Sequence, residues 1–258
     1  MNGAELLVSA MEKEGVQQIF GVPGEENLDL IEALRRSTIK LVVTRHEQGA
    51  AFIAATHGRL TGRAGVCLST LGPGALNLTT GAAYALLGAM PMIMITGQKG
   101  IRSRKQARFQ VVDMVSTMTP LTKMAHQIVS PVTIPSIVRE AFRVAQQERP
   151  GPVHLELPED IAAETAPAIP PVPLHPIDRP IAPRAALDRA AALILKAERP
   201  LVMLGAAASR PHLADSLSNF VKRLHIPFFN TQMGKGACRV SAGAYRRVAI
   251  RPRVPSDR

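Results

Sequence analysis

The chain has 258 residues, of which 46% are hydrophobic and 20% are charged, as is ordinary for a globular protein. Its two cysteines, Cys67 and Cys238, indicate a reducing compartment and exclude a disulfide scaffold. The first residues carry acids and no basic segment ahead of an apolar core, so no signal peptide is expected. The longest apolar stretch is interrupted by Gly88 and Pro91 and is too short for a membrane span. We therefore expect a cytoplasmic protein.

The net charge of +11 raises the question of nucleic-acid binding. Much of this charge lies in residues 238–258, which contain six Arg and one Asp. No nucleic-acid-binding motif and no aromatic-studded basic strand accompany it. We expect no nucleic-acid partner; the alternative predicts salt-dependent DNA binding that disappears when residues 238–258 are removed.

Residues 1–166 alternate between helical and strand patterns. The expected helices share an apolar face with a period of 3.6 residues or a run of small residues; they cover residues 3–14, a segment from about 28 that Asn27 caps, 47–60, a small-residue helix after 74, and 132–147. The expected strands are short and rich in apolar residues; they cover residues 17–20, 39–44, 64–68, 92–96 and 153–157. Residues 21–24 and 72–74 are expected turns, and a polar loop is expected between 97 and 131.

This alternation predicts an α/β fold, with a mostly parallel sheet covered by helices on both faces. Ligands of such sheets bind at the carboxyl ends of the strands. The loops there are residues 21–24, 44–49, 69–77 and 96–100, and they carry the most distinctive residues of the chain.

The second part of the chain begins after a proline-rich segment. Residues 167–183 hold seven prolines and are expected to form a semi-extended linker between domains. Residues 184–237 then restart the α/β pattern, with helices at 184–197 and 211–223 and strands at 201–204 and 226–230, as a partial second domain. Residues 238–258 show neither period, and we expect no regular structure there.

Glu47 is the first candidate for chemistry. The segment Thr44-Arg45-His46-Glu47-Gln48-Gly49-Ala50-Ala51 places a carboxylate where a strand ends and a helix begins. Its small neighbours allow a bulky ligand to approach closely. The structural alternative is an acid in the first turn of a helix, stabilised by the helix dipole. This segment alone leaves both readings open.

A second glycine-rich segment, Ser69-Thr70-Leu71-Gly72-Pro73-Gly74-Ala75-Leu76-Asn77, is compatible with a simple turn or with an anion site at a helix start. It contains no nucleotide-binding P-loop pattern.

The order and spacing of these segments closely resemble those of the pyrimidine-binding domain of thiamine-diphosphate-dependent enzymes, and acetolactate synthases are the nearest match. The motifs that carry the resemblance occur in one order: Gly21-Val22-Pro23-Gly24, His46-Glu47-Gln48-Gly49-Ala50, Gly72-Pro73-Gly74-Ala75 with Asn77, Pro91 with Ile95-Thr96-Gly97-Gln98, Phe109-Gln110, and Arg149-Pro150-Gly151-Pro152-Val153. The resemblance is strong over residues 1–165 and weaker to 237, where the chain looks like the start of the family's central domain.

The resemblance implies a role for each matching residue. Glu47 matches the glutamate that hydrogen-bonds N1′ of the aminopyrimidine and favours its imino tautomer. Val22, Pro23 and Gly24 match the loop beside the thiazolium, and Pro73 and Asn77 match positions beside the aminopyrimidine. Phe109, Gln110 and Lys123 match positions near the substrate, with Gln110 assigned to catalysis together with Glu47. For Lys123, an exposed structural lysine is the alternative.

The resemblance also implies an activity. Pyruvate would add to the cofactor and lose CO₂, and the resulting carbanion would attack a second 2-keto acid, a transferase reaction of branched-chain amino acid biosynthesis. Relatives are homodimers or tetramers with active sites between subunits, and some bind FAD through the central domain. Mg²⁺ is held there by a third domain through a Gly-Asp-Gly motif and a later Asn.

The chain departs from the family pattern in three places. Gly88-Ala89-Met90 replaces the acidic–small pair that many relatives carry before the proline at Pro91. No segment matches the metal–diphosphate motif, so no metal ligand is predicted, and the chain by itself is expected to be inactive. Residues 238–258 resemble a shifted reading frame. Two alternatives therefore remain open: another thiamine-diphosphate decarboxylase, carboligase or oxidase, and a non-catalytic fragment or interaction module.

Overall fold

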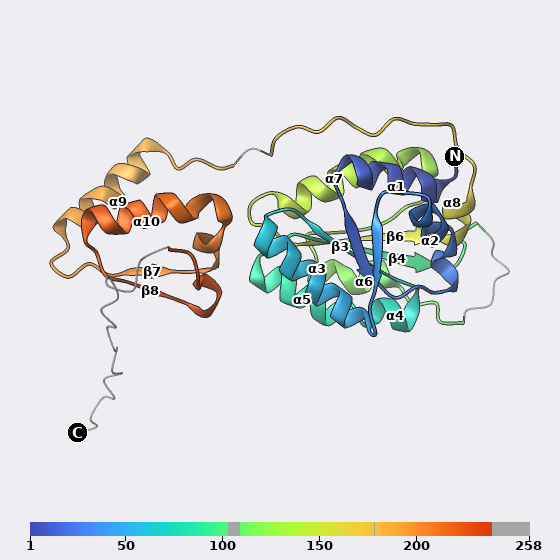
Figure 1. Ribbon diagram of the computed structural model, residues 1–258, viewed down its shortest axis with the longest axis horizontal. Helices are drawn as coiled ribbons and strands as arrows, with labels where there is room; N and C mark the ends of the chain where they lie inside the picture. Colours follow the sequence, from blue (N-terminus) through green and yellow to red (C-terminus); the bar gives the residue numbers. More distant parts are fainter. Residues whose placement is uncertain (103–108, 178, 239–258) are drawn as a thin grey trace, which may run out of the picture. The chain divides into compact units, whose positions relative to one another are not determined.

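The computed structural model describes residues 1–102, 109–177 and 179–238. The chain divides into two compact units, Met1–Ile181 and Ala182–Arg258 (Figure 1). Each is described separately.

The first unit is built on a six-stranded sheet in which every neighbouring pair of strands is parallel. The strands are β1 (Gln18–Gly21), β2 (Lys40–Val43), β3 (Gly65–Ser69), β4 (Met92–Gln98), β5 (Met124–Gln127) and β6 (Pro152–Pro158). Their order is β2-β1-β3-β4-β6-β5. The predicted α/β class with a parallel sheet is confirmed.

Helices cover both faces of this sheet (Figure 1). One face carries α1 (Gly3–Lys13), α2 (Leu28–Arg35), α7 (Ile134–Gln146) and α8 (Glu159–Ala163). The other face carries α3 (Glu47–Thr61), α4 (Gly72–Leu76), α5 (Thr79–Gly88) and α6 (Met114–Met118). Short 3₁₀ turns lie at Glu25–Asn27, Thr119–Leu121 and Pro131–Thr133.

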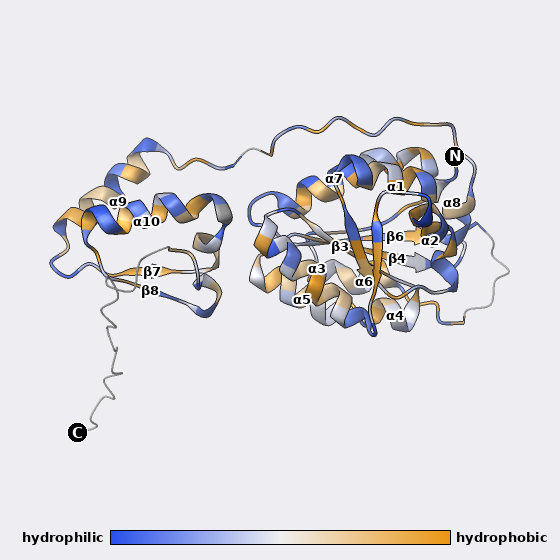
Figure 2. Cartoon of the chain, viewed as in Figure 1, coloured by the Kyte–Doolittle hydropathy of each residue, from blue (hydrophilic) through white to orange (hydrophobic). Residues whose placement is uncertain are grey.

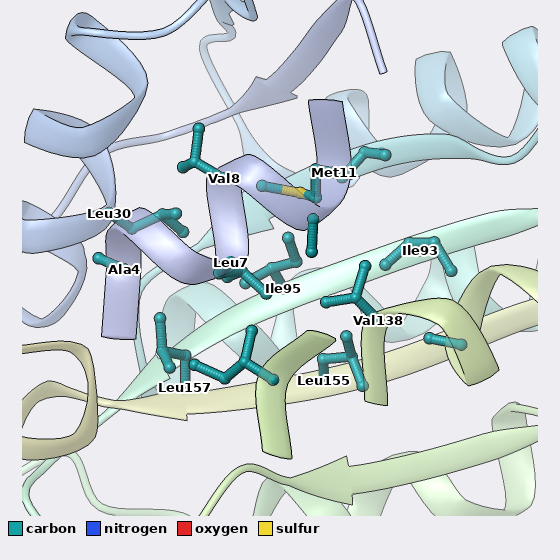
Figure 3. Close-up of a cluster of buried hydrophobic side chains, with 14 of the residues drawn as sticks. Ala4, Leu7, Val8, Met11, Leu30, Ile93, Ile95, Val138, Leu155 and Leu157 are labelled. Carbon is teal, nitrogen blue, oxygen red and sulfur yellow. The ribbon is translucent and has the colours of Figure 1, made fainter. Parts of the chain in front are cut away.

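The core beneath α1 and α7 is aliphatic. Ile93 and Ile95 of β4 and Leu155 and Leu157 of β6 point to this face, where they meet Leu7 of α1 (Figure 3). All seven residues of β4 and all seven of β6 are buried, as expected for central strands covered on both faces. Figure 2 shows hydrophobic and hydrophilic residues interspersed along α7, the pattern of a helix with one buried side.

Three elements differ from the sequence expectation. Residues 72–74, expected as a turn, are the first residues of helix α4, with Pro73 in its first turn, where proline is tolerated. The expected polar loop contains α6 and the edge strand β5, which pairs with β6 alone. Asn27 does not cap α2 with its side chain; its Oδ1 accepts a hydrogen bond from the Gly24 amide at 3.0 Å.

The second unit is smaller. It contains α9 (Arg184–Lys196), β7 (Val202–Leu204), α10 (Ala214–Leu224) and β8 (Phe228–Asn230), with 3₁₀ turns at Ala206–Ser209, Pro211–Leu213 and Gln232–Gly234. β7 and β8 form a two-stranded parallel sheet. Its small core gathers Leu204, Val221, Ala237 and Cys238, whereas α9 has no buried residue. The Arg-rich tail was predicted over residues 238–258; Cys238 belongs to the core of this unit, and residues 239–258 lie outside the described residues.

Candidate active site

The carboxyl ends of the parallel strands bring the predicted loops to one edge of the sheet. The strand order reverses direction between β1 and β3, the position where ligands of such sheets bind. The loop with Val22, Pro23 and Gly24 follows β1, and Thr70 follows β3. A Cβ on Gly24 would lie 2.6 Å from the Cβ of Thr70, so only glycine allows the two loops to approach this closely.

Glu47 is the first residue of α3, beyond the end of β2. His46 precedes it as the N-cap, and its Nδ1 accepts a hydrogen bond from the Gln48 amide at 3.1 Å. His46 thus has a structural role here, as the cap of α3. The Glu47 side chain is half-buried, and its Oε2 accepts a hydrogen bond from Asn77 Nδ2 at 2.9 Å. Asn77 is 30 residues further along the chain, so the fold brings these two candidates together.

Gly74 lies directly beside this carboxylate. A Cβ on Gly74 would lie 3.2 Å from Glu47 Oε1 and 2.9 Å from Thr70 Cγ2, whereas a Cβ on Gly49 would meet nothing within 4 Å. Pro73, in the same helix α4, is exposed. Glycine at position 74 therefore keeps the Glu47 carboxylate free of a crowding side chain.

The segment with Phe109 and Gln110 reaches the same edge. Gln110 has a positive φ of 59°, and its carbonyl oxygen lies 2.2 Å from where a Cβ on Gly72 would be. Phe109 is 71% exposed. Gln98, at the end of β4, donates a hydrogen bond to Val112 O at 3.1 Å and so ties this segment to the sheet.

Glu26, which the sequence analysis did not single out, links three of these loops. Its side chain is 7% exposed, and it forms a 2.8 Å ion pair with Lys99 and accepts a 2.5 Å hydrogen bond from Thr70. Burial alone would raise the pKa of Glu26, but the bonds from Lys99 and Thr70 outweigh it and lower that pKa below its ordinary value. In the sequence, Glu25-Glu26 looks like an ordinary acidic first turn, so no local signal marks it.

A second buried carboxylate lies on β6. Glu156 is 1% exposed and accepts hydrogen bonds from Gln98 at 3.1 Å and from Gln127. Burial, with the nearby charge of Asp113, raises its pKa against the effect of these bonds. Two residues earlier, burial lowers the pKa of His154 to about 4. In the sequence, the only sign of this buried polar group is that His154 and Glu156 interrupt the apolar run of residues 153–157.

Lys123 does not join the site. It precedes the first residue of β5 and so lies at the amino ends of the strands, opposite the edge that carries Glu47. Its ammonium donates to the carbonyl oxygens of Val144 and Gln147, the latter at 2.8 Å, at the carboxyl end of α7. The structure thus gives Lys123 the role of capping a helix, and we leave it out of the proposed site.

The segment Arg102-Ser103-Arg104-Lys105 after β4 is basic, and the charge of its first residue is paired with an acid. Arg102 forms a 2.6 Å ion pair with Glu164, and its amide donates to Asp160 at 2.9 Å. Arg104 and Lys105 lie outside the described residues. Within the described ranges, no group of three His, Cys, Asp or Glu residues could hold a metal ion, and no helix is both long and apolar enough to cross a membrane.

The chemistry available at this edge is proton exchange by a carboxylate that a neighbouring amide orients. Comparison with known proteins identifies the ligand class. Residues 1–117 match the family model described as thiamine pyrophosphate enzyme, N-terminal TPP binding domain, and residues 187–246 match the central domain of the same enzymes. The chain belongs to the thiamine pyrophosphate (thiamine diphosphate) enzymes.

Within these enzymes, the chain is similar to several acetolactate synthases. The chain is 39% identical over 243 residues to a probable acetolactate synthase large subunit of Methanocaldococcus jannaschii, covering 92% of this chain and 41% of that protein. It is 37% identical over 247 residues to an acetolactate synthase of Arthrospira platensis, covering 92% and 42%. It is 36% identical over 244 residues to a chloroplastic acetolactate synthase of Brassica napus, covering 92% and 38%. The chain thus spans about two fifths of the length of these relatives.

Proposed function

We propose that this chain supplies the aminopyrimidine-binding part of an acetolactate-synthase-type enzyme, which condenses pyruvate with a second 2-keto acid to an acetohydroxy acid. The observation that carries the proposal is the hydrogen bond from Asn77 Nδ2 to Glu47 Oε2, 2.9 Å long, at the ligand-binding edge of the sheet. The names of the relatives support the choice of reaction within the family.

The residues at this edge fit the cofactor. A carboxylate is the group needed beside a ring nitrogen that gains and loses a proton, and the glycine at position 74 keeps a side chain away from Glu47 Oε1. Because Oε2 faces the Asn77 donor, it serves as an acceptor, and the proton that Glu47 exchanges resides on Oε1. Asn77 thereby fixes which oxygen is turned toward the ring.

The remaining loops bind and orient. Val22, Pro23 and Gly24 would lie against the thiazolium, and Pro73 would lie against the aminopyrimidine. Phe109 and Gln110 would contact the 2-keto acid, with Gln110 within reach of the reacting atoms. When bound, thiamine diphosphate supplies the stabilisation of the carbanion that follows decarboxylation.

The proposal extends to the oligomeric state, the metal, FAD and the cellular location. The working enzyme would be a homodimer or tetramer with Mg²⁺ at the diphosphate, held by parts of the relatives that this chain does not match. FAD binding would involve the central domain, of which residues 187–246 match the family model. Both cysteines are buried and free, which supports a reducing location such as the cytoplasm.

The test is a chimera in which residues 1–237 replace the matching part of the Arthrospira platensis relative. With thiamine diphosphate, Mg²⁺ and pyruvate, it should form acetolactate. Formation of acetaldehyde or acetate alone would assign the chain to another branch of the family. A folded chimera that binds thiamine diphosphate but turns over no 2-keto acid would refute the proposal.

A further inference from the structure

The side-chain amide of Gln98 occupies a junction between the sheet and the segment of residues 109–113. Gln98 ends β4 and is 6% exposed. Its Nε2 donates to two acceptors, Val112 O and Glu156 Oε1, each at 3.1 Å. Its Oε1 accepts from the Lys99 amide at 3.0 Å. Both amide hydrogens and the carbonyl oxygen are therefore used.

The buried carboxylate of Glu156 determines how this amide is oriented. Both oxygens of Glu156 accept hydrogen bonds in the structure, so Gln98 presents its NH₂ group to Oε1 rather than its oxygen. The second oxygen of Glu156 is occupied by Gln127 from the other neighbouring strand, β5. The second hydrogen on Gln98 Nε2 is thereby directed to Val112 O.

The same segment is held from the opposite side by the loop after β3. Gln110 has a φ of 59°, a conformation that side-chain-bearing residues rarely adopt and that persists only when the surroundings impose it. Its carbonyl oxygen approaches Gly72 so closely that a Cβ there would lie 2.2 Å away. Residues 110–112 are thus fixed between Gly72 and Gln98.

We propose that Gln98 is a positioning residue that holds the backbone of residues 109–113 so that Phe109 and Gln110 present their side chains to the 2-keto acid. The inference rests on the proposed function, in which these two side chains contact the substrate. Gln98 itself acts only through Val112 and the backbone that follows Gln110.

Gln127 provides a matched control. Gln98→Met removes the donors to both Val112 O and Glu156 and keeps an unbranched side chain. Gln127→Met removes a donor to the same Glu156 carboxylate and leaves the Val112 bond in place. A difference between the two variants therefore reports the bond to Val112, not the general cost of an unsatisfied carboxylate.

The first readout uses the full chain and requires no activity. NMR backbone order parameters of residues 110–113 should fall in Gln98→Met from roughly 0.85 toward 0.6 and should stay unchanged in Gln127→Met. Unchanged values in Gln98→Met, or an equal fall in both variants, would overturn the proposal. If Gln98→Met does not fold, the unaltered chain provides the test. The side-chain amide protons of Gln98 should be protected from exchange with solvent and should show cross-relaxation to Val112. Amide protons that exchange freely would overturn the proposal.

The second readout separates positioning from a structural role. In the chimera, Gln98→Met should raise the KM for pyruvate about tenfold and also lower kcat, because the displaced segment carries both the substrate contact of Phe109 and the catalytic Gln110. Gln127→Met should change neither. A mobile segment with an unchanged KM would overturn the inference yet leave the proposed function intact, whereas an unaltered chimera without turnover would be a failure of the proposed function.

Discussion

Asn77 Nδ2 donates a 2.9 Å hydrogen bond to Glu47 Oε2 and so joins the end of α4 to the start of α3, 30 residues apart in the sequence. This bond orients the half-buried carboxylate of Glu47 at the ligand-binding edge. If Glu47 exchanges a proton with the cofactor ring, the orientation supplied by Asn77 must affect the rate.

Asn77→Ala is expected to lower acetolactate formation by the chimera about tenfold, because a hydrogen bond to a charged, partly exposed group contributes on the order of 1.5 kcal/mol. Steady-state kinetics with saturating thiamine diphosphate measure this. Thr80→Ala, an exposed change three residues away, should have little effect. An Asn77→Ala chimera with full activity would show that the bond does not serve catalysis.

Gly74 and Gly49 are expected to respond oppositely to alanine. Gly74→Ala brings a Cβ to 2.9 Å from Thr70 Cγ2 and should destabilise the unit and impair cofactor binding. Gly49→Ala meets nothing in the protein and should stabilise α3 by roughly 0.5–1 kcal/mol. Thermal unfolding of the chain compares the two. A loss of stability in Gly49→Ala as large as that in Gly74→Ala would contradict this expectation.

The Glu26–Lys99 ion pair is expected to stabilise the chain in a pH-dependent way. Because the folded-state pKa of Glu26 is lowered, its contribution is present above the ordinary pKa and is lost as pH falls through the folded value. Glu26→Gln should therefore cost roughly 1–3 kcal/mol near pH 7, and the difference from wild type should shrink as pH falls below about 4.

Glu32 is the control for this experiment. It pairs with Arg35 and Arg36 on the surface, and hydrogen bonds from these side chains lower its pKa to about 2. Glu32→Gln should leave the unfolding temperature nearly unchanged, because exposed pairs contribute little. A Glu26→Gln penalty that persists undiminished at pH 3 would contradict the electrostatic account.

The apolar surface of α9 is expected to bind hydrophobic dyes. Leu193 and Leu195 are 72% and 84% exposed, and no residue of this helix is buried. Leu193→Gln with Leu195→Gln should reduce dye fluorescence and improve solubility without lowering the main unfolding temperature. A large fall in that temperature would mean that α9 is packed in solution.

The elements with strong periods could be predicted from the sequence, and those that depend on tertiary context could not. The apolar runs of β4 and β6 and the amphipathic α7 were predicted within a few residues. β5 was missed because an edge strand of half-buried residues carries neither an apolar run nor an alternating pattern. α4 was read as a turn because Gly72-Pro73-Gly74 is a strong local turn signal that the packed fold overrides.

In the candidate site, too, some residues could be predicted from the sequence and others could not. Glu47 stands out by its place between a strand and a helix, but its pairing with Asn77 depends on the whole sheet. Glu26 and Gln98 carry no local signal, because their importance comes from burial and from partners in distant loops. The resemblance to a family supplied the roles, while spacing alone left each segment compatible with a simple turn or cap.

The central claim is that Glu47 exchanges a proton with the cofactor, and the C2 proton of thiamine diphosphate reports it most directly. Its exchange with deuterium should be measured by NMR in the chimera and in its Glu47→Gln variant, each with an unfolding curve as a check of folding. We predict a loss of at least about 100-fold in the exchange rate with an unchanged unfolding temperature. An exchange rate that stays the same in the folded Glu47→Gln variant would contradict the account.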